Sequence, residues 1–247
     1  MLAMASDLDG TLVFDQEFKE KDIEAIQSFR EKGNLFGICS GRVLDAILMS
    51  TRGVIDCDFY IASSGSVIAD RNLNILYASY IDFQTIKQLY EDYHNICAVF
   101  FQADGEYYNI YRNYGFDTKI IYDLDELKDK KHTGISFEFK EGEEEKARIV
   151  NEELAIRYPY LIGHQNKASI DITPRDCSKG NALLKVKELF HIDTIGGIGD
   201  SYNDLPMIQK ADLGFTFTYA PESIQKQADR IVEHEYEALK ELEEYHV

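Results

Sequence analysis

Two aspartates stand one residue apart directly after the first apolar run of the chain, in the stretch DLDGT at residues 7–11. Asp7 can act as a nucleophile on phosphorus and form an aspartyl-phosphate. Asp9 lies on the same side of an extended chain, so it can protonate a leaving oxygen and later take a proton from water. Gly10 permits a tight turn whose amides face a phosphate, and Thr11 caps or orders that loop. The stretch therefore predicts chemistry on a phosphate ester.

Three further polar groups stand where a short apolar run ends or a helix begins. They are SGR at 40–42, SKG at 178–180 and GDSYND at 199–204. In an open parallel sheet, ligands bind at the carboxyl ends of the strands, so these groups converge if their strands are neighbours. Several carboxylates together need a cation, and oxygen ligands without Cys or His favour Mg²⁺. Lys179 and Ser40 then suit phosphate binding, whereas Arg42 either binds phosphate too or pairs with an acid.

The segments that position these groups alternate between strand and helix patterns, which is typical of a parallel sheet covered by helices. Apolar runs favour strands, and apolar residues near a 3.6-residue period favour helices. The expected strands are at 1–6, 34–40, 57–65, 194–200, 213–219 and 228–234, and the expected helices at 15–33, 43–53, 178–190, 203–211 and 235–247.

The alternation of strand and helix patterns changes in the middle of the chain. Two strand-like runs within 95–111 are joined by Asp104-Gly105, a strong hairpin signal. A strand at 132–139, a helix at 141–159 and two strand-like pieces within 161–175 follow. We therefore expect an α/β core made of residues 1–81 and 173–247, interrupted by an inserted α/β domain at 82–172.

The formal net charge of −18 argues against nucleic acid and against an anionic membrane as partners. A small anionic substrate remains compatible with this charge, because surface charges are screened beyond about 8–10 Å and a local cation cluster can hold a phosphate. No apolar run approaches 18 residues, and the N-terminus lacks the basic and apolar regions of a signal peptide. We therefore expect no membrane span and a cytoplasmic location.

Taken in order and spacing, the four motifs resemble those of the haloacid dehalogenase-like (HAD) phosphohydrolases. The position of the insert resembles that of the Cof-type subclass IIB, whose members are mostly Mg²⁺-dependent sugar-phosphate phosphatases. The resemblance implies a Rossmann-like HAD core with an inserted α/β cap, and a phosphatase of small phosphorylated metabolites. One departure is visible: members often read Asn-Gly after the third core strand, whereas this chain reads Ser64-Gly65.

The resemblance also implies a role for each matching residue. Asp7 would be the nucleophile, and Asp9 the acid/base whose backbone carbonyl also reaches the metal. Asp200 would complete the protein ligands of the metal, and Asp204 would support the metal or Lys179. The predicted metal residues are thus Asp7, Asp9, Asp200 and Asp204. The predicted phosphate- or substrate-binding residues are Thr11, Ser40, Gly41, Arg42, Lys179 and Asn203.

Two other functions stay open on the sequence. A phosphomutase on the same scaffold would pass the phosphoryl group to a second sugar instead of water. A non-catalytic regulatory protein that binds a sugar phosphate would not need the nucleophile, yet both aspartates and the lysine are intact. A P-loop nucleotide hydrolase is excluded, since no G-x-x-x-x-G-K-[ST] is present. The sequence carries no indication of the oligomeric state.

Overall fold

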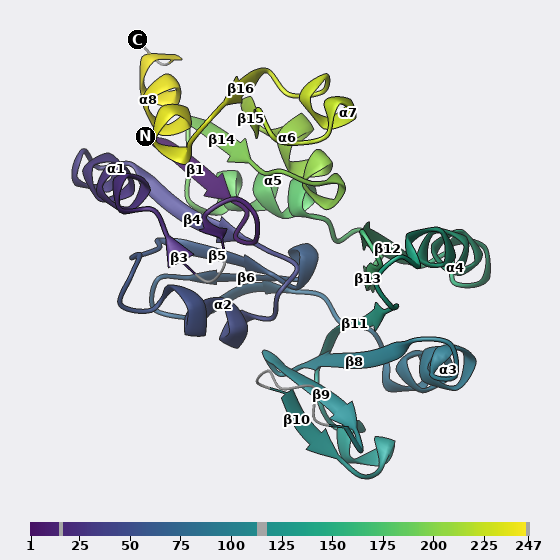
Figure 1. Cartoon of the computed structure of the whole chain (residues 1–247). Coiled ribbons are helices and arrows are strands. Elements are labelled where there is room, and N and C mark those ends of the chain that lie inside the picture. The colour runs from purple at the N-terminus through teal and green to yellow at the C-terminus, as the bar shows by residue number, and fades with distance from the viewer. Residues whose placement is uncertain (15–16, 113–117, 246–247) are drawn as a thin grey trace.

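A computed structural model describes residues 1–14, 17–112 and 118–245 of the chain (Figure 1). Its larger sheet has eight strands. The first strand of the chain lies inside this sheet, between two strands that are far apart from each other in the sequence. In spatial order the strands are β16 (Arg230–Val232), β15 (Leu213–Phe217), β14 (Thr194–Ile198), β1 (Leu2–Ser6), β4 (Leu35–Cys39), β5 (Phe59–Ala62), β6 (Val67–Asp70) and β7 (Ile75–Ala78).

The sheet is parallel from β16 to β5, as predicted, and antiparallel at the edge formed by β6 and β7. The sequence pattern did not indicate this antiparallel edge. It follows from the short link between β5 and β6, the 3₁₀ turn η1 (Ser63–Gly65). A parallel crossover needs a dozen or more residues, so two strands joined this closely must run antiparallel.

Helices cover both faces of the large sheet, because its strands are apolar on both sides. Along β1, Leu2 and Met4 belong to one buried cluster, whereas Ala3 and Ala5 belong to another. The first cluster contains residues of α1 (Glu20–Glu31), α2 (Leu44–Thr51) and α8 (Glu235–Tyr245), and the second contains residues of α5 (Lys179–Leu189) and α6 (Leu205–Lys210). Two short helices are also present. The helix η3 (Tyr202–Asp204) precedes α6, and α7 (Glu222–Gln225) follows β15.

The helix expected over 15–33 is shorter than predicted and begins only at Glu20. The preceding segment instead forms a small hairpin, in which β2 (Val13–Phe14) pairs with β3 (Glu17–Phe18). Residues 15–16, which the prediction also included, lie outside the described residues. Among the described residues, no helix combines the length and the apolar composition that a membrane span requires.

The middle of the chain forms a second, six-stranded sheet, which Figure 1 shows beside the first. The expected hairpin is present at Asp104-Gly105, and both residues adopt positive φ. The division of the chain at 82–172 stays a prediction. In spatial order this sheet contains β10 (Thr118–Ile121), β9 (Glu106–Ile110), β8 (Ala98–Ala103), β11 (His132–Glu138), β13 (Ser169–Pro174) and β12 (Leu161–Asn166).

One face of the second sheet is covered by α3 (Phe83–Tyr93) and α4 (Glu144–Arg157), with the short η2 (Leu124–Leu127) beside them. Apolar residues of these helices and of the strands form a separate buried cluster. In Figure 1 both long helices lie on the side of the second sheet that is remote from the first. The other face of the second sheet is therefore turned toward the first sheet.

A buried carboxyl group lies behind the end of β1. Glu235, the first residue of α8, is 1% exposed, and its Oε2 accepts a hydrogen bond from the Ser6 hydroxyl at 3.2 Å. Its Oε1 has no hydrogen-bond partner among the described residues. Burial, with a smaller contribution from the charge of Asp22, raises the pKa of Glu235 well above its usual value.

This shift predicts a pH-dependent stability. The folded chain keeps the Glu235 proton at pH values where the unfolded chain has lost it, so stability falls as pH rises above the usual pKa of about 4.5. Relative to the parent, Glu235→Gln should therefore gain unfolding free energy with rising pH, by up to about 1.4 kcal/mol per pH unit. Urea unfolding at pH 5 to 8 measures this difference. The control Glu244→Gln, at an exposed position of the same helix, should show the same pH dependence of the unfolding free energy as the parent. If the unfolding free energies of Glu235→Gln and the parent changed in parallel with pH, the prediction would be contradicted.

Candidate active site

The predicted convergence of strand ends is present in the large sheet. β1 pairs with β14 and with β4, and Ser6 lies level with Ile198 and Ile38 at their carboxyl ends. The next residue, Asp7, donates its backbone amide to the Ile198 carbonyl at 2.9 Å. The motifs at 7–11, 40–42 and 199–204 therefore begin at one edge of the sheet, as their positions in the sequence predict.

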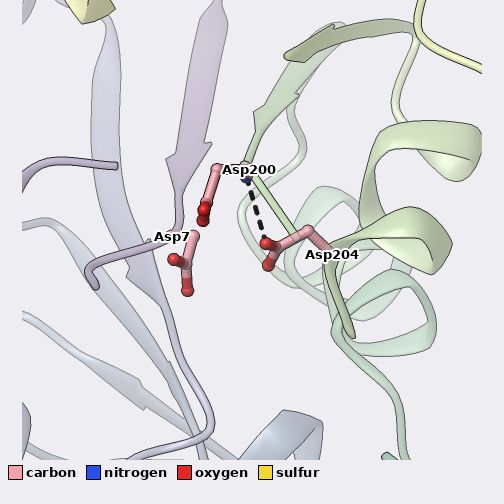
Figure 2. A group of neighbouring side chains, drawn as sticks. All are labelled: Asp7, Asp200 and Asp204. Atoms are coloured by element: carbon pink, nitrogen blue, oxygen red, sulfur yellow. Dashed lines mark hydrogen bonds between the residues drawn. The ribbon is translucent and has the colours of Figure 1, made fainter. Parts of the chain in front are cut away.

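Three carboxyl groups meet at this edge (Figure 2). Asp7, Asp200 and Asp204 each offer one oxygen, and these oxygens all lie within 4.8 Å of one another. Asp7 and Asp204 are buried, and Asp200 is half-buried. Three oxygen donors this close form a suitable site for a hard cation.

Lys179 provides the positive charge within this acidic group. Its Nζ donates hydrogen bonds to Asp7 Oδ1 at 2.6 Å and to Asp204 Oδ1 at 2.5 Å. The side chain comes from the start of α5, where Ser178 caps the helix by accepting a hydrogen bond from the Asn181 amide. Burial disfavours the ammonium ion, but Asp204 and Asp7 outweigh that effect and raise the pKa of Lys179 well above its usual value.

The loop that follows β14 fixes Asp204. Its Oδ2 accepts hydrogen bonds from the amides of Asp200 and Ser201, at 3.2 and 3.0 Å, and from the Ser201 hydroxyl at 3.0 Å. A Cβ on Gly199 would lie 2.4 Å from Asp204 Cγ, so only glycine allows this approach. Both oxygens of Asp204 are thus occupied by the loop and by Lys179.

One ammonium among three carboxyl groups leaves the site short of positive charge. Burial, followed by the charge of Asp204, raises the pKa of Asp7 to about 8, although Lys179 opposes the shift. Burial and Asp204 also raise the pKa of Asp200, to about 6. Near neutral pH the group therefore retains a proton that a bound cation would displace.

The turn after Asp7 packs against Asp200. Gly10 has a φ of +79°, and a Cβ there would lie 3.0 Å from Asp200 Oδ2, so glycine is needed on both grounds. The Thr11 hydroxyl donates to Asp200 Oδ1 at 3.5 Å. The Tyr219 hydroxyl, which the sequence did not single out, donates to the Gly10 carbonyl at 2.7 Å. The turn is therefore held from both sides.

The structure does not bring the Asp9 carboxylate into the acidic group. Asp9 instead pairs with Arg42, whose Nε donates to Asp9 Oδ2 at 2.8 Å and whose Nη1 donates to the Ser50 hydroxyl at 2.7 Å. The Asp9 side chain is 51% exposed, so it is accessible from solvent. Of the two roles considered for Arg42, the structure favours pairing with an acid, and its predicted contact with phosphate stays a prediction.

The remaining predicted residues lie around the same edge. Ser40 is buried, and its hydroxyl accepts a hydrogen bond from the Arg42 amide at 3.2 Å. Gly41 follows it in the same loop. Asn203 accepts a hydrogen bond from the Ser201 hydroxyl at 2.5 Å through its Oδ1. Their contacts with a phosphate stay predictions.

Sequence reasoning missed Asp171 of β13, which reaches this edge from the second sheet. A Cβ on Gly41 would lie 2.5 Å from Asp171 Oδ2, so the carboxylate closely approaches the 40–42 loop. The available signal was the alternation in SIDIT at 169–173, which turns Asp171 away from its apolar neighbours.

Cation binding to the acidic group should be linked to pH. Since the pKa of Asp7 is about 8, a divalent cation must displace its proton near pH 7. Affinity should therefore rise about tenfold per pH unit below pH 8 and level off above it. Calorimetric titration with MgCl₂ at pH 6.5 to 8.5, in buffers of different ionisation enthalpy, measures both the affinity and the released proton. An affinity that does not change with pH would contradict the assignment.

Comparison with known proteins identifies the family. The model of the haloacid dehalogenase-like hydrolase family matches residues 4–238. The 5-amino-6-(5-phospho-D-ribitylamino)uracil phosphatase YcsE of Bacillus subtilis is 27% identical over 233 residues, which cover 93% of this chain and 89% of the relative. A phosphoglycolate phosphatase of Staphylothermus marinus is 24% identical over 239 residues, which cover 91% and 88% of the two chains.

Solved structures share the fold over its whole length. A haloacid dehalogenase-like hydrolase from B. subtilis superposes with a TM-score of 0.83 at 18% identity, covering 98% of this chain and 99% of the other. The subclass IIB sugar phosphatase BT4131 superposes with a TM-score of 0.79 at 21% identity, covering 100% and 99%. The α/β fold with an inserted cap that the four motifs implied is thereby confirmed. Since the family model spans nearly the entire sequence, the protein belongs to the haloacid dehalogenase-like hydrolases.

Proposed function

We propose that the protein is a Mg²⁺-dependent phosphatase that hydrolyses small phosphorylated metabolites, above all sugar phosphates, through an aspartyl-phosphate on Asp7. The observation that carries this proposal is the contact of one buried lysine, Lys179, with both Asp7 and Asp204 beside Asp200. This arrangement supports the proposal, because a nucleophilic carboxylate, a fixed positive charge and a cation would then lie within one small volume.

The residues present fit a hard divalent cation with oxygen ligands. Asp7 and Asp200 have oxygens that can bind it directly, whereas both oxygens of Asp204 are already engaged. We therefore assign Asp204 to the support of Lys179 and of the 199–204 loop. When bound, Mg²⁺ would offset negative charge on the phosphate oxygens.

Asp7 attacks phosphorus in line with the departing oxygen, and the ester P–O bond breaks as the aspartyl-phosphate forms. Asp9 gives its proton to that oxygen. In the second step Asp9 takes a proton from water as the water oxygen attacks phosphorus, and inorganic phosphate and free Asp7 result. Lys179, Ser40 and the amides of the 7–11 loop hold the phosphoryl oxygens in both steps.

The contact between Asp9 and Arg42 has a consequence for this reaction. Both carboxylate oxygens of Asp9 accept hydrogen bonds from the Arg42 guanidinium, so Asp9 must leave Arg42 before it can reach the leaving group. Its side chain is half exposed. We infer that Arg42 holds Asp9 beside the site until a substrate arrives.

The relatives support a small phosphorylated substrate. The name of YcsE describes a phosphatase of a phosphorylated ribityl compound, and that relative matches 93% of this chain. The second sheet, whose helix-free face is turned toward the core, would act as a lid that excludes bulk water and selects the leaving group (Figure 1).

Replacing the nucleophile should abolish activity. Asp7→Asn has the same shape but cannot attack phosphorus, so turnover of p-nitrophenyl phosphate should fall at least about 10³-fold. Phosphate release in excess MgCl₂ is the measurement. The control Asp56→Asn removes a carboxylate that is 89% exposed and should leave turnover unchanged. Equal turnover by Asp7→Asn and the parent would refute the assignment of Asp7 as the nucleophile.

Activity should also depend on the cation, and water should be the acceptor of the phosphoryl group. The parent should release phosphate steadily from a panel of phosphorylated sugars and sugar alcohols when MgCl₂ is present. Treatment with EDTA should stop the reaction, and added MgCl₂ should restore it, because three clustered acids otherwise repel the phosphate. A requirement for an added sugar bisphosphate, with isomerised sugar phosphate as the product, would indicate a phosphomutase instead.

A further inference from the structure

Tyr219 links the loop after β15 to the turn that follows β1, although β14 lies between these two strands. Its hydroxyl donates a hydrogen bond to the Gly10 carbonyl at 2.7 Å, and within the described part of the chain no other donor reaches this carbonyl. Its ring stacks on the buried Phe217, with 4.8 Å between the ring centroids, and meets the edge of Phe14 at 5.8 Å. The side chain is therefore placed by packing as well as by the hydrogen bond.

The backbone on either side of Tyr219 is also fixed. The side-chain amide of Gln225, in α7, donates to the carbonyls of the two flanking residues, Thr218 at 2.9 Å and Ala220 at 2.8 Å. The Thr218 amide donates to the Val232 carbonyl of β16 at 2.9 Å. Because the loop is held at three points, the tyrosine hydroxyl is preorganised for its contact with the turn.

The turn at Gly10 needs such a contact to keep one orientation. The close approach of Asp200 Oδ2 and a φ of +79° require glycine at this position. Glycine is also the most flexible residue, so the peptide between Gly10 and Thr11 can rotate at low energetic cost. In a trans peptide the carbonyl and the following amide point in opposite directions, and no described peptide bond is cis. By holding the Gly10 carbonyl, Tyr219 therefore also directs the Thr11 amide toward the other side of the turn.

Three amides of this turn are available to a ligand. The amides of Leu8, Asp9 and Thr11 donate to no acceptor among the described residues. They follow directly after Asp7, at the edge of the sheet where the acidic group lies. Backbone amides that are left unpaired in a turn attract anions, so their orientation matters for the phosphoryl oxygens of the proposed reaction.

We propose that Tyr219 is a positioning residue for phosphoryl transfer, which holds the Gly10 carbonyl and thereby orients the amides that receive the phosphoryl oxygens. This inference rests on the proposed phosphatase function and adds a residue that acts through the turn and not on the substrate itself. Preorganised donors stabilise the charge that develops in the transition state more than the charge of the bound ester. The effect of Tyr219 therefore concerns the phosphoryl group and is independent of the leaving group.

The variant Tyr219→Phe removes only the hydroxyl and keeps the ring against Phe217 and Phe14. Loss of this hydrogen bond should lower kcat about three- to tenfold, with KM within about twofold of the parent. The decrease should be equal for p-nitrophenyl phosphate and for a sugar phosphate, because both present the same phosphoryl group. An unchanged kcat, or a decrease for only one of the two esters, would overturn the inference and leave the phosphatase function intact.

Binding of orthovanadate in excess MgCl₂ tests the same role without turnover. Vanadate with five ligands resembles the phosphoryl group during transfer, so its dissociation constant in Tyr219→Phe should rise by the factor by which kcat/KM falls. The dissociation constant of Mg²⁺ alone should stay within about twofold, because the hydroxyl bonds to Gly10 and not to an acid of the cation site. Calorimetry measures both constants. Equal weakening of both ligands would indicate a general loss of structure at the site and would overturn the inference.

A second variant alters the support of Tyr219 and leaves the tyrosine in place. Gln225→Met has a similar length but lacks the amide that binds the carbonyls of Thr218 and Ala220. It should lower kcat in the parent and cause no further decrease in Tyr219→Phe, because both changes act through one contact. Decreases in kcat that multiply in the double variant would contradict a common route through the Tyr219 hydroxyl.

A matched control and the parent enzyme separate the outcomes. Tyr108→Phe removes another tyrosine hydroxyl, which donates to Glu106 at 2.7 Å in the second sheet, and it should leave kcat and vanadate binding unchanged. A parent that releases phosphate from no ester at all, p-nitrophenyl phosphate included, would contradict the phosphatase function itself and the inference with it.

Discussion

The site depends on three clustered carboxyl groups, two of which pair with one buried ammonium. At an effective dielectric constant of about 20, two like charges 4 Å apart repel by about 4 kcal/mol, so Asp7, Asp200 and Asp204 cannot all be ionised without compensation. Lys179 supplies one positive charge, and burial together with the negative charge of Asp204 raises the pKa values of Asp7 and Asp200. The large sheet, with β1 between β14 and β4, maintains this arrangement despite the repulsion.

Close packing at this edge requires glycine at several positions. Gly199 lets Asp204 turn back under the loop, Gly10 lets the first turn pass Asp200, and Gly41 leaves room for Asp171. Each of these residues belongs to one of the motifs that the sequence displays. The glycines therefore belong to the motifs for a steric reason, since any side chain would displace a carboxylate from the site.

The sequence predicted the features that depend on local pattern. The apolar runs before Asp7, Ser40 and Asp200 indicated strands, and the rule that ligands bind at strand ends brought these residues together. Contacts between distant segments were not predictable in this way. The approach of Asp171 to Gly41 depends on how the second sheet lies on the first, and the burial of Glu235 depends on where α8 packs. Neither arrangement leaves a periodic signal in the chain.

In the proposed function, the same excess of negative charge would determine the order in which the cation and the substrate bind. A phosphate ester is itself an anion, and it would enter a site where one lysine already serves two carboxylates and Asp171 adds a further negative charge from the second sheet. In the proposed function, Lys179 alone would not offset this repulsion, so phosphate binding would become favourable only after a cation had bound to Asp7 and Asp200. The excess negative charge that would favour the cation would then also make substrate binding conditional on it.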